Sequence, residues 1–253
     1  MSVVSVIVQA DHYAMMACDG VASHHTNGTV VGYVSKITLL PELDAAIGVT
    51  GIYGLAQMMQ WCMPIGTSSF DELVECLPRL MWDACELTGR VSGVVCGKSC
   101  VVVVGWSHQR QRYEGWRITN YDKEVRTGGA DTASKMLPAF TMTQLNDNQM
   151  WSSSGPSEKV MRKFGVINGP EETNDIDCLR RMICAARADS GRKTEQYDFF
   201  NAGGFIQIAQ VQKGYVQSAI NHRWPEDVIG EPIDPTRGQP MPDDLMDHYD
   251  AQA

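Results

Sequence analysis

Three residues near the start of the chain have types that could support chemistry on a hydroxyl group. They are an acid, a lysine and a glycine, namely Asp19, Lys36 and Gly51. A lysine ammonium favours an ionised hydroxyl, and an aspartate can hold that lysine in place. A backbone N–H at a glycine turn can stabilise an oxyanion, by roughly a few kcal/mol. The pattern therefore indicates a reaction centre built around the chain's own first residues.

Short apolar segments would position these residues, each of which lies at the end of a predicted strand. The chain opens with SVVSVIV (Ser2 to Val8), and a second run, YAMMAC, ends at Asp19 and Gly20. Two β-rich segments joined by a few turn residues predict a hairpin. Lys36 lies within SKITLL, and another apolar segment, AAIGVTG, ends at Gly51. In the alternative interpretation, Asp19 only ends a strand and Lys36 is a surface residue.

The opening strand, AMMACDG, SKI and IGVTGIYGL together resemble the proteasome-like branch of the N-terminal-nucleophile hydrolases, over roughly residues 1–220. In that family the first residue of the mature chain is a Thr, Ser or Cys nucleophile, and its α-amine is the base. The resemblance implies that Asp19 is the acid, Lys36 the lysine and Gly51 the glycine whose N–H faces the oxyanion. An α-amine has an unperturbed pKa of ~7.7–8.0, so it can accept a hydroxyl proton at neutral pH without a histidine.

The resemblance leaves two registers open for the nucleophile. Removal of Met1 would expose Ser2, which lies 17 residues before Asp19, one more than the family's spacing. Matching VVSV to the family's strand without a shift instead places Met1 in the catalytic position. A one-residue slip turns every side chain of a strand to the opposite face, so the two registers exclude each other.

Two serine motifs further along also resemble the family. The WSSSG segment, with Ser154, is similar to the serine–glycine turn that backs the nucleophile, and ADSG, with Ser190, is similar to a second serine motif. The family's acid three residues before that serine is replaced here by Arg187. A second positive charge would disfavour the charged form of Lys36. Asp189 could replace the missing acid only if the loop is rearranged.

The remaining chain alternates helical and strand-like patterns. Helices are predicted at 52–63, 70–87, 133–140, within 151–165 and at 176–188, and strands at 100–107, 112–121, 204–211 and 214–220. Two sheets that each bury one face, with helices on their outer faces, fit this order. We therefore expect an α+β fold, a four-layer αββα sandwich of two antiparallel sheets like that of a proteasome subunit. A doubly wound α/β fold fits less well because the strands come in hairpins.

We expect a proteasome-like domain at 1–224 and an acidic, proline-rich tail at 225–253. The tail holds eight acidic residues, one basic residue and five of the eleven prolines. Such a segment cannot bury enough apolar surface to fold alone. We expect it to leave the globular body along an extended path and to dock on another chain, and a solubilising tail is the alternative. The candidate docking residues are Val228, Ile229, Ile233, Met241, Leu245 and Met246.

Composition excludes several classes of function. The chain is 43% hydrophobic and 20% charged, as in ordinary soluble globular proteins. No apolar run approaches the ~20 residues of a membrane span, and the N-terminus lacks the basic region of a signal peptide. We therefore expect no membrane partner and a location in the cytoplasm or in a particle assembled there. The net charge of −9 argues against nucleic acid.

The cysteine and histidine spacings predict no metal site and no cofactor. The eight cysteines match no zinc pattern, and without a secretion signal we expect reduced thiols. His12, His24 and His25 have no carboxylate or cysteine at a spacing that completes a ligand set.

Two hypotheses of different classes remain from the sequence. In the first, the chain is a proteasome-like building block of a homo-oligomer or a larger particle, such as a virion, and has lost catalysis. Its partners are then copies of itself or neighbouring subunits. In the second, it is an active peptidase or amidohydrolase whose nucleophile is Ser2 after removal of Met1. The mature N-terminus separates the two, because a retained Met1 excludes the enzyme.

Overall fold

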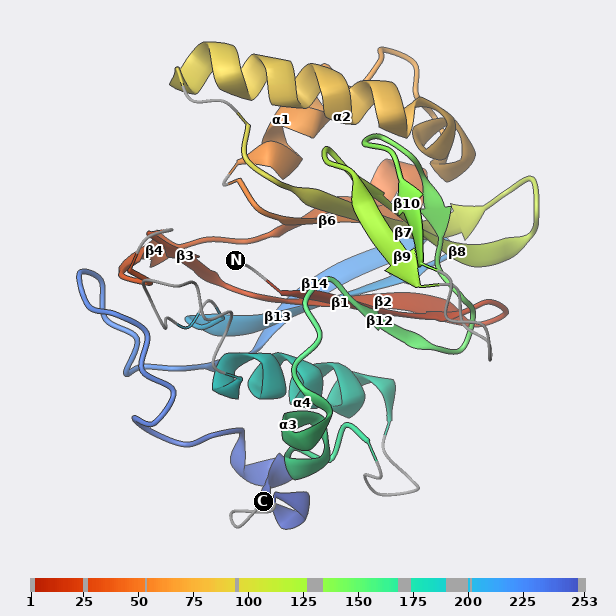
Figure 1. Cartoon of the computed structure of the whole chain (residues 1–253). Helices are drawn as coiled ribbons and strands as arrows, with labels where there is room; N and C mark the ends of the chain where they lie inside the picture. Colours follow the sequence, from red (N-terminus) through yellow and green to blue (C-terminus); the bar gives the residue numbers. More distant parts are fainter. Residues whose placement is uncertain are drawn as a thin grey trace.

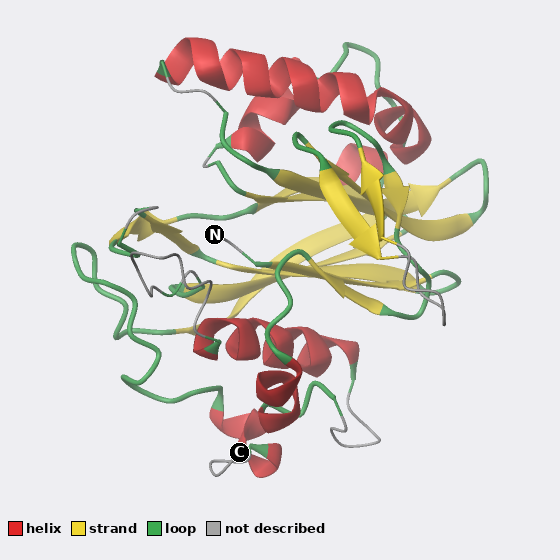
Figure 2. Ribbon diagram, viewed as in Figure 1, coloured by secondary structure: helices red, strands yellow, loops and turns green. Residues whose placement is uncertain are grey.

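Two five-stranded antiparallel sheets form the centre of the molecule in the computed structural model (Figures 1 and 2). The structure describes residues 3–24, 27–52, 54–93, 96–126, 134–167, 174–189, 200 and 202–249. Sheet I contains, in order, β12 (Met150–Ser152), β1 (Val4–Gln9), β2 (Tyr13–Asp19), β13 (Phe205–Gln212) and β14 (Tyr215–Arg223). Sheet II contains, in order, β11 (Thr143–Gln144), β8 (Arg112–Thr119), β7 (Cys100–Ser107), β6 (Ala45–Thr50) and β5 (Ile37–Leu40). The α+β class with antiparallel sheets is confirmed.

Smaller elements complete the chain. Two separate antiparallel pairs are β3 (Val21–Ser23) with β4 (Val30–Tyr33), and β9 (Lys123–Arg126) with β10 (Ser134–Leu137). The helices are α1 (Leu55–Cys62), α2 (Phe70–Ser92), α3 (Glu158–Lys163) and α4 (Asp175–Ala188), with 3-10 turns η1 (Pro41–Leu43) and η2 (Asp243–His248). As Figures 1 and 2 show, α1 and α2 lie over the outer face of sheet II, and α3 and α4 lie over the outer face of sheet I.

The predicted opening hairpin is the centre of sheet I. β1 pairs with β2 from Val4 opposite Cys18 to Gln9 opposite Tyr13, and β12 pairs along its other edge. Successive side chains of a strand point to opposite faces. Val4 therefore packs toward sheet II, whereas Ile7 packs toward α4. Because both faces of β1 are buried, its sequence is apolar almost throughout.

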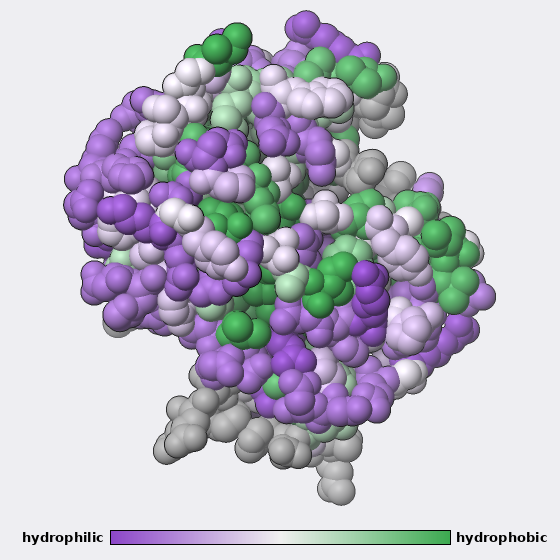
Figure 3. Space-filling view, turned by 180° about the vertical axis from the view of Figure 1, so that it is seen from behind, coloured by the Kyte–Doolittle hydropathy of each residue, from purple (hydrophilic) through white to green (hydrophobic). Residues whose placement is uncertain are grey.

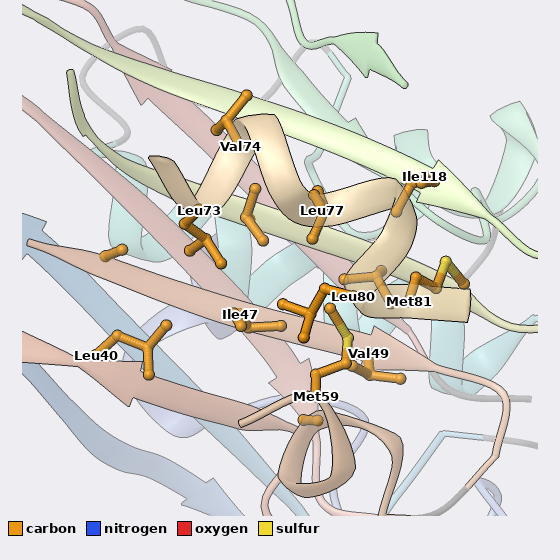
Figure 4. Close-up of a cluster of buried hydrophobic side chains, with 14 of the residues drawn as sticks. Leu40, Ile47, Val49, Met59, Leu73, Val74, Leu77, Leu80, Met81 and Ile118 are labelled. Atoms are coloured by element: carbon orange, nitrogen blue, oxygen red, sulfur yellow. The ribbon is translucent and has the colours of Figure 1, made fainter. Parts of the chain in front are cut away.

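Helix α2 carries the apolar face that the sequence predicts. Its first turn is capped by Ser69, whose hydroxyl accepts a hydrogen bond from the Glu72 N–H at 3.2 Å. The helix continues through Pro78 and ends at Gly93. Its buried residues, including Leu73, Leu77 and Leu80, pack with Ile47 and Val49 of β6 (Figure 4). None of the helices among the described residues combines the length and apolar composition needed to cross a bilayer.

The helix predicted at 133–140 is wrong. Residues Ser134–Leu137 instead form β10, which pairs with β9 from Ser134 opposite Arg126 to Leu137 opposite Lys123. Pro138 lies inside the predicted helix, where it would remove a backbone hydrogen bond. Antiparallel pairing with the preceding strand β9 therefore outweighs the weak helical propensity of the segment.

The expectation that the C-terminal segment leaves the body is also wrong for the described residues. From Pro225 the chain runs past the β3–β4 hairpin and then below α4 and α3 (Figure 1). The Val30 N–H donates to the Glu231 carbonyl at 2.8 Å, and Ile233 packs beside Val30. Met241 and Leu245 are buried in the core between sheet I and the helices α3 and α4. Val228 and Ile229, by contrast, are exposed.

Candidate functional site

Asp19 and Lys36 form a buried ion pair between the two sheets. The Lys36 Nζ lies 2.6 Å from Asp19 Oδ2, and the side chains are 9% and 0% exposed. Asp19 ends β2 of sheet I, whereas Lys36 directly precedes β5 of sheet II. The structure thus brings together two of the residues that the sequence singled out, one from each sheet.

The same carboxylate fixes the start of β1. Asp19 Oδ1 accepts a hydrogen bond from the Val3 N–H at 2.9 Å. Its other oxygen also accepts longer bonds, each 3.4 Å, from the N–H groups of Val21 and Gly203. The Val3 N–H is therefore held at the ion pair. Met1 and Ser2 themselves lie outside the described residues.

Gly51 follows directly after β6 in a conformation that suits glycine. Its φ is +110°, where residues with a side chain are strained. A Cβ atom at this position would lie against the Ser99 hydroxyl and 2.5 Å from the Lys98 carbonyl oxygen. Lys36 is tied to the same strand, because its carbonyl accepts the Val49 N–H at 3.0 Å. β6 therefore connects the glycine turn to the lysine.

Polar side chains beside the ion pair are hydrogen-bonded to one another. Gln207 of β13 accepts a hydrogen bond from the Ser35 hydroxyl at 2.8 Å and donates to Ser218 at 3.3 Å. Burial, and then the nearby Asp19 charge, raise the pKa of the Cys18 thiol to about 12. Cys18 therefore stays protonated at neutral pH and is a poor nucleophile.

The first serine motif reaches β1 through Ser153 rather than Ser154. The Ser153 hydroxyl accepts the Val4 N–H at 3.0 Å, and the Ser153 N–H donates to the Val4 carbonyl at 2.9 Å. Ser154 contributes its carbonyl, which accepts the Ser152 hydroxyl at 3.3 Å. The turn thus contacts the start of β1 through Ser153, the residue before the predicted Ser154.

The second serine motif is described only in part. Ser190 lies outside the described residues. Asp189 does not replace the missing acid, because its carboxylate accepts the Ser157 N–H at 2.5 Å at the start of α3. The charge of Arg187 is instead neutralised by a residue that the sequence analysis missed.

That residue is Asp227, from the C-terminal segment. Arg187 is 2% exposed and makes two hydrogen bonds to the Asp227 carboxylate, at 2.7 and 2.9 Å. The same carboxylate accepts the Gly204 N–H at 2.6 Å. Gly203 contacts Asp19, so this second ion pair supports the loop that touches the first. A carboxylate partner offsets much of the cost of burying an arginine charge. The acids that follow Trp224 in the sequence were the signal that could have identified this partner.

The site offers charge and fixed backbone donors rather than metal ligands. Among the described residues, no group of three or more His, Cys, Asp or Glu side chains is placed to hold a metal ion. A fixed ammonium group beside a buried carboxylate can stabilise negative charge that develops on a neighbouring oxygen. The arrangement can therefore stabilise negative charge on an oxygen atom near the start of β1.

Comparison with known proteins shows a similarity of fold but none of sequence. No family model matches the chain, and no curated protein matches it in sequence. Among solved structures, an Anbu (Gly-1) mutant from Hyphomicrobium sp. strain MC1 is similar with a TM-score of 0.54 and 9% identity, over 90% of each chain. Anbu (ancestral beta-subunit) from Yersinia bercovieri is similar with a TM-score of 0.52 and 10% identity, over 88% of each chain.

These findings correct the family resemblance drawn from the short sequence motifs. The comparisons do not support membership of the proteasome-like N-terminal-nucleophile hydrolases, which the sequence motifs had suggested, because no family model matches the chain. The likeness to Anbu is one of fold, at an identity too low to carry residue roles. The chain thus shares the fold of the Anbu structures.

Proposed function

We propose that the chain is an amide hydrolase whose nucleophile is the hydroxyl of Ser2, exposed as the first residue when Met1 is removed. The observation that carries this proposal is the buried Asp19–Lys36 pair, held against the Val3 N–H at the start of β1. Because the Val3 N–H itself bonds to Asp19, we infer that the pair serves the residue before Val3. Of the two hypotheses drawn from the sequence, we therefore favour the active enzyme over the building block that has lost catalysis.

The free-energy cost of burying two charges favours a functional role for the Asp19–Lys36 pair. Transfer of two charged groups from water into a protein interior costs several kcal/mol per ion, which their mutual attraction only partly offsets. Apolar residues of similar volume often give equal or greater stability at such a position. A buried acid–lysine pair at a strand end beside the chain start is thus better explained by chemistry than by stability.

The residues act in the following order. The Ser2 α-amine accepts the hydroxyl proton, and the Ser2 oxygen attacks the carbonyl carbon of an amide. Lys36, oriented by Asp19, stabilises the negative charge on the attacking oxygen, and the Gly51 N–H stabilises the oxyanion. The amine leaves with the proton from the α-amine, and an ester to Ser2 remains. Water, deprotonated by the same α-amine, then hydrolyses the ester.

Two measurements on the purified full-length chain test this proposal. Intact mass is expected to show loss of Met1, and a peptidyl β-lactone is expected to acylate Ser2 with a mass increase of one probe molecule. Ser2→Ala should abolish the adduct. Ser5→Ala, a change on the same strand, should leave it intact because Ser5 is buried against β12. A retained Met1, or labelling that persists in Ser2→Ala, would exclude Ser2 as the nucleophile.

We infer a four-layer αββα sandwich, supported by three separate apolar cores. One lies between α1, α2 and sheet II, one between the two sheets, and one between sheet I and the helices α3 and α4. Each core is bounded by a different pair of layers.

A second candidate function is assembly into an oligomer of identical subunits. Several large apolar residues are exposed on α1, α2 and the turn between them, namely Trp61, Ile65, Trp82 and Val91. Figure 3 shows that hydrophobic residues on the back face of the molecule also lie in separate patches among hydrophilic ones. Exposed apolar surface on one layer favours contact with a second copy.

Substitution on this layer tests assembly. Trp61→Glu is expected to reduce the particle mass in light scattering to that of one chain, 28.0 kDa. Val31→Glu, at another exposed apolar residue, is the matched control and should leave the mass unchanged. A wild-type mass of one chain at all concentrations would rule out this function.

A further inference from the structure

Two cysteines outside the site described above lie close enough to react with each other. Cys85 belongs to α2, and Cys96 lies between α2 and β7. Their sulfur atoms are 3.2 Å apart, and both residues are partly exposed. A disulfide bond is about 2.05 Å long, so an approach of roughly 1 Å would form one.

A single amide group holds this pair in place. The Asn120 Nδ2 lies 3.7 Å from the Cys85 sulfur and 3.6 Å from the Cys96 sulfur. It also donates to the Gly97 carbonyl at 3.0 Å, while Asn120 Oδ1 accepts the Ser99 N–H at 2.8 Å. The residue after β8 therefore fixes both the sulfur atoms and the backbone that carries Cys96.

In this environment the pKa values of the two thiols shift in opposite directions, so one thiol is the nucleophile and the other is its partner. The hydrogen bond with Cys85, and then those with Ser99 and Asn120, favour the thiolate and lower the pKa of Cys96 to about 7, against the effect of burial. The hydrogen bond with Cys96, followed by burial, raises the pKa of Cys85. A thiol with a pKa near the ambient pH is the best attacking group in thiol–disulfide exchange.

The other six cysteines differ from this pair. Burial raises the pKa of every one of them: Cys18, Cys62, Cys76, Cys100, Cys178 and Cys184. Raised values favour the protonated, unreactive thiol. The short distance between the sulfur atoms thus distinguishes the pair of Cys85 and Cys96, and the lowered pKa distinguishes Cys96 from all the other cysteines.

We propose that Cys85 and Cys96 form a reversible, redox-active disulfide that exchanges with low-molecular-weight disulfides such as oxidised glutathione. The Cys96 thiolate attacks one sulfur of the small disulfide, whose S–S bond breaks and releases one thiolate. The Cys85 thiol then loses its proton to water and attacks the Cys96 sulfur of the mixed disulfide, which releases the second small thiolate. Two protein thiols are oxidised, and one small disulfide is reduced to two thiols.

The disulfide would join the C-terminal half of α2 to the segment that leads into β7. Ser99 of this segment accepts the Ile52 N–H at 3.2 Å and lies against Gly51. Oxidation would therefore fix the backbone beside the glycine turn. Only this consequence for Gly51 rests on the proposed hydrolase function, because the exchange reaction itself requires no hydrolysis.

Exchange with glutathione tests the proposal on the full-length protein. The reduced chain is equilibrated without oxygen in glutathione buffers of increasing oxidised fraction, quenched with acid and alkylated. We expect the loss of two alkylated thiols, a cross-linked Cys85–Cys96 peptide, and reversal of both by dithiothreitol. The oxidised form should also show a rise in Tm of several degrees, because the cross-link restricts the unfolded chain.

Variants decide which thiols are responsible. Cys85→Ser and Cys96→Ser should each prevent the loss of two thiols, and Cys96→Ser alone should also prevent the mixed disulfide. Cys62→Ser and Cys76→Ser are matched controls on α1 and α2 and should behave as the wild type. Full alkylation at every glutathione ratio would overturn the proposal. So would a mixed disulfide at Cys96 that never resolves, or a cross-link to another cysteine.

Discussion

Lys36→Met is expected to slow the acylation of Ser2 by the β-lactone about 10²–10³-fold, the size of effect seen when one transition-state donor is removed. The same change should lower the free energy of unfolding by about 3–5 kcal/mol, because it leaves the Asp19 carboxylate buried without its cation. Acylation is followed by intact mass, and stability by urea denaturation.

A double variant separates these two effects. In Asp19→Asn/Lys36→Met the buried charge is absent, and the asparagine oxygen can still accept the Val3 N–H. We expect most of the stability to return, because replacement of both members of a buried pair is often nearly neutral. Acylation should remain slow. Recovery of both properties would mean that the ion pair has only a structural role.

Asp227→Ala is expected to destabilise the chain by about 3–5 kcal/mol. The change would leave Arg187 buried without its principal partner and would remove the acceptor of the Gly204 N–H. The midpoint and slope of urea unfolding measure the loss. The large effect arises because the C-terminal segment is part of the folded body rather than an appendage.

The neighbouring acid provides a matched control. Glu226 lies 3.5 Å from Arg187 and is more exposed than Asp227. Glu226→Ala should therefore change stability by only about 0–1 kcal/mol, as is typical of weak ion pairs. Equal losses in the two variants would contradict the assignment of Asp227 as the essential partner.

Local pattern was sufficient to predict the opening hairpin and to place Asp19 at the end of its second strand. The apolar runs around the short turn after Gln9 determine how β1 and β2 pair, and Asp19 follows at the end of β2. Because the approach of Lys36 depends on how one sheet packs against the other, its position was obtained from the family resemblance and not from periodicity. The ion pair found in the structure is nevertheless the one that the resemblance implied.

Long-range contacts account for what the sequence did not reveal. Asp227 and Arg187 are 40 residues apart, so no helical or strand period relates them. Proline and acid content suggested a free tail, but Ile233, Met241 and Leu245 each occupy an apolar site formed by distant parts of the chain. A sparse set of apolar residues is enough to anchor an extended segment when the body supplies complementary surfaces.

The order of strands in sheet I has a consequence for the folding of the protein. β2, from the first 19 residues, is completed on one side by β13, which begins at Phe205, and β12 lies on the far side of β1. Closure of such long loops slows folding, and during synthesis the first strands emerge long before their partner. The Gly203 N–H that bonds to Asp19 is separated from it by 184 residues. The surroundings of the ion pair can therefore be completed only when almost the whole chain has been made, which delays any reactivity of this site until the end of folding.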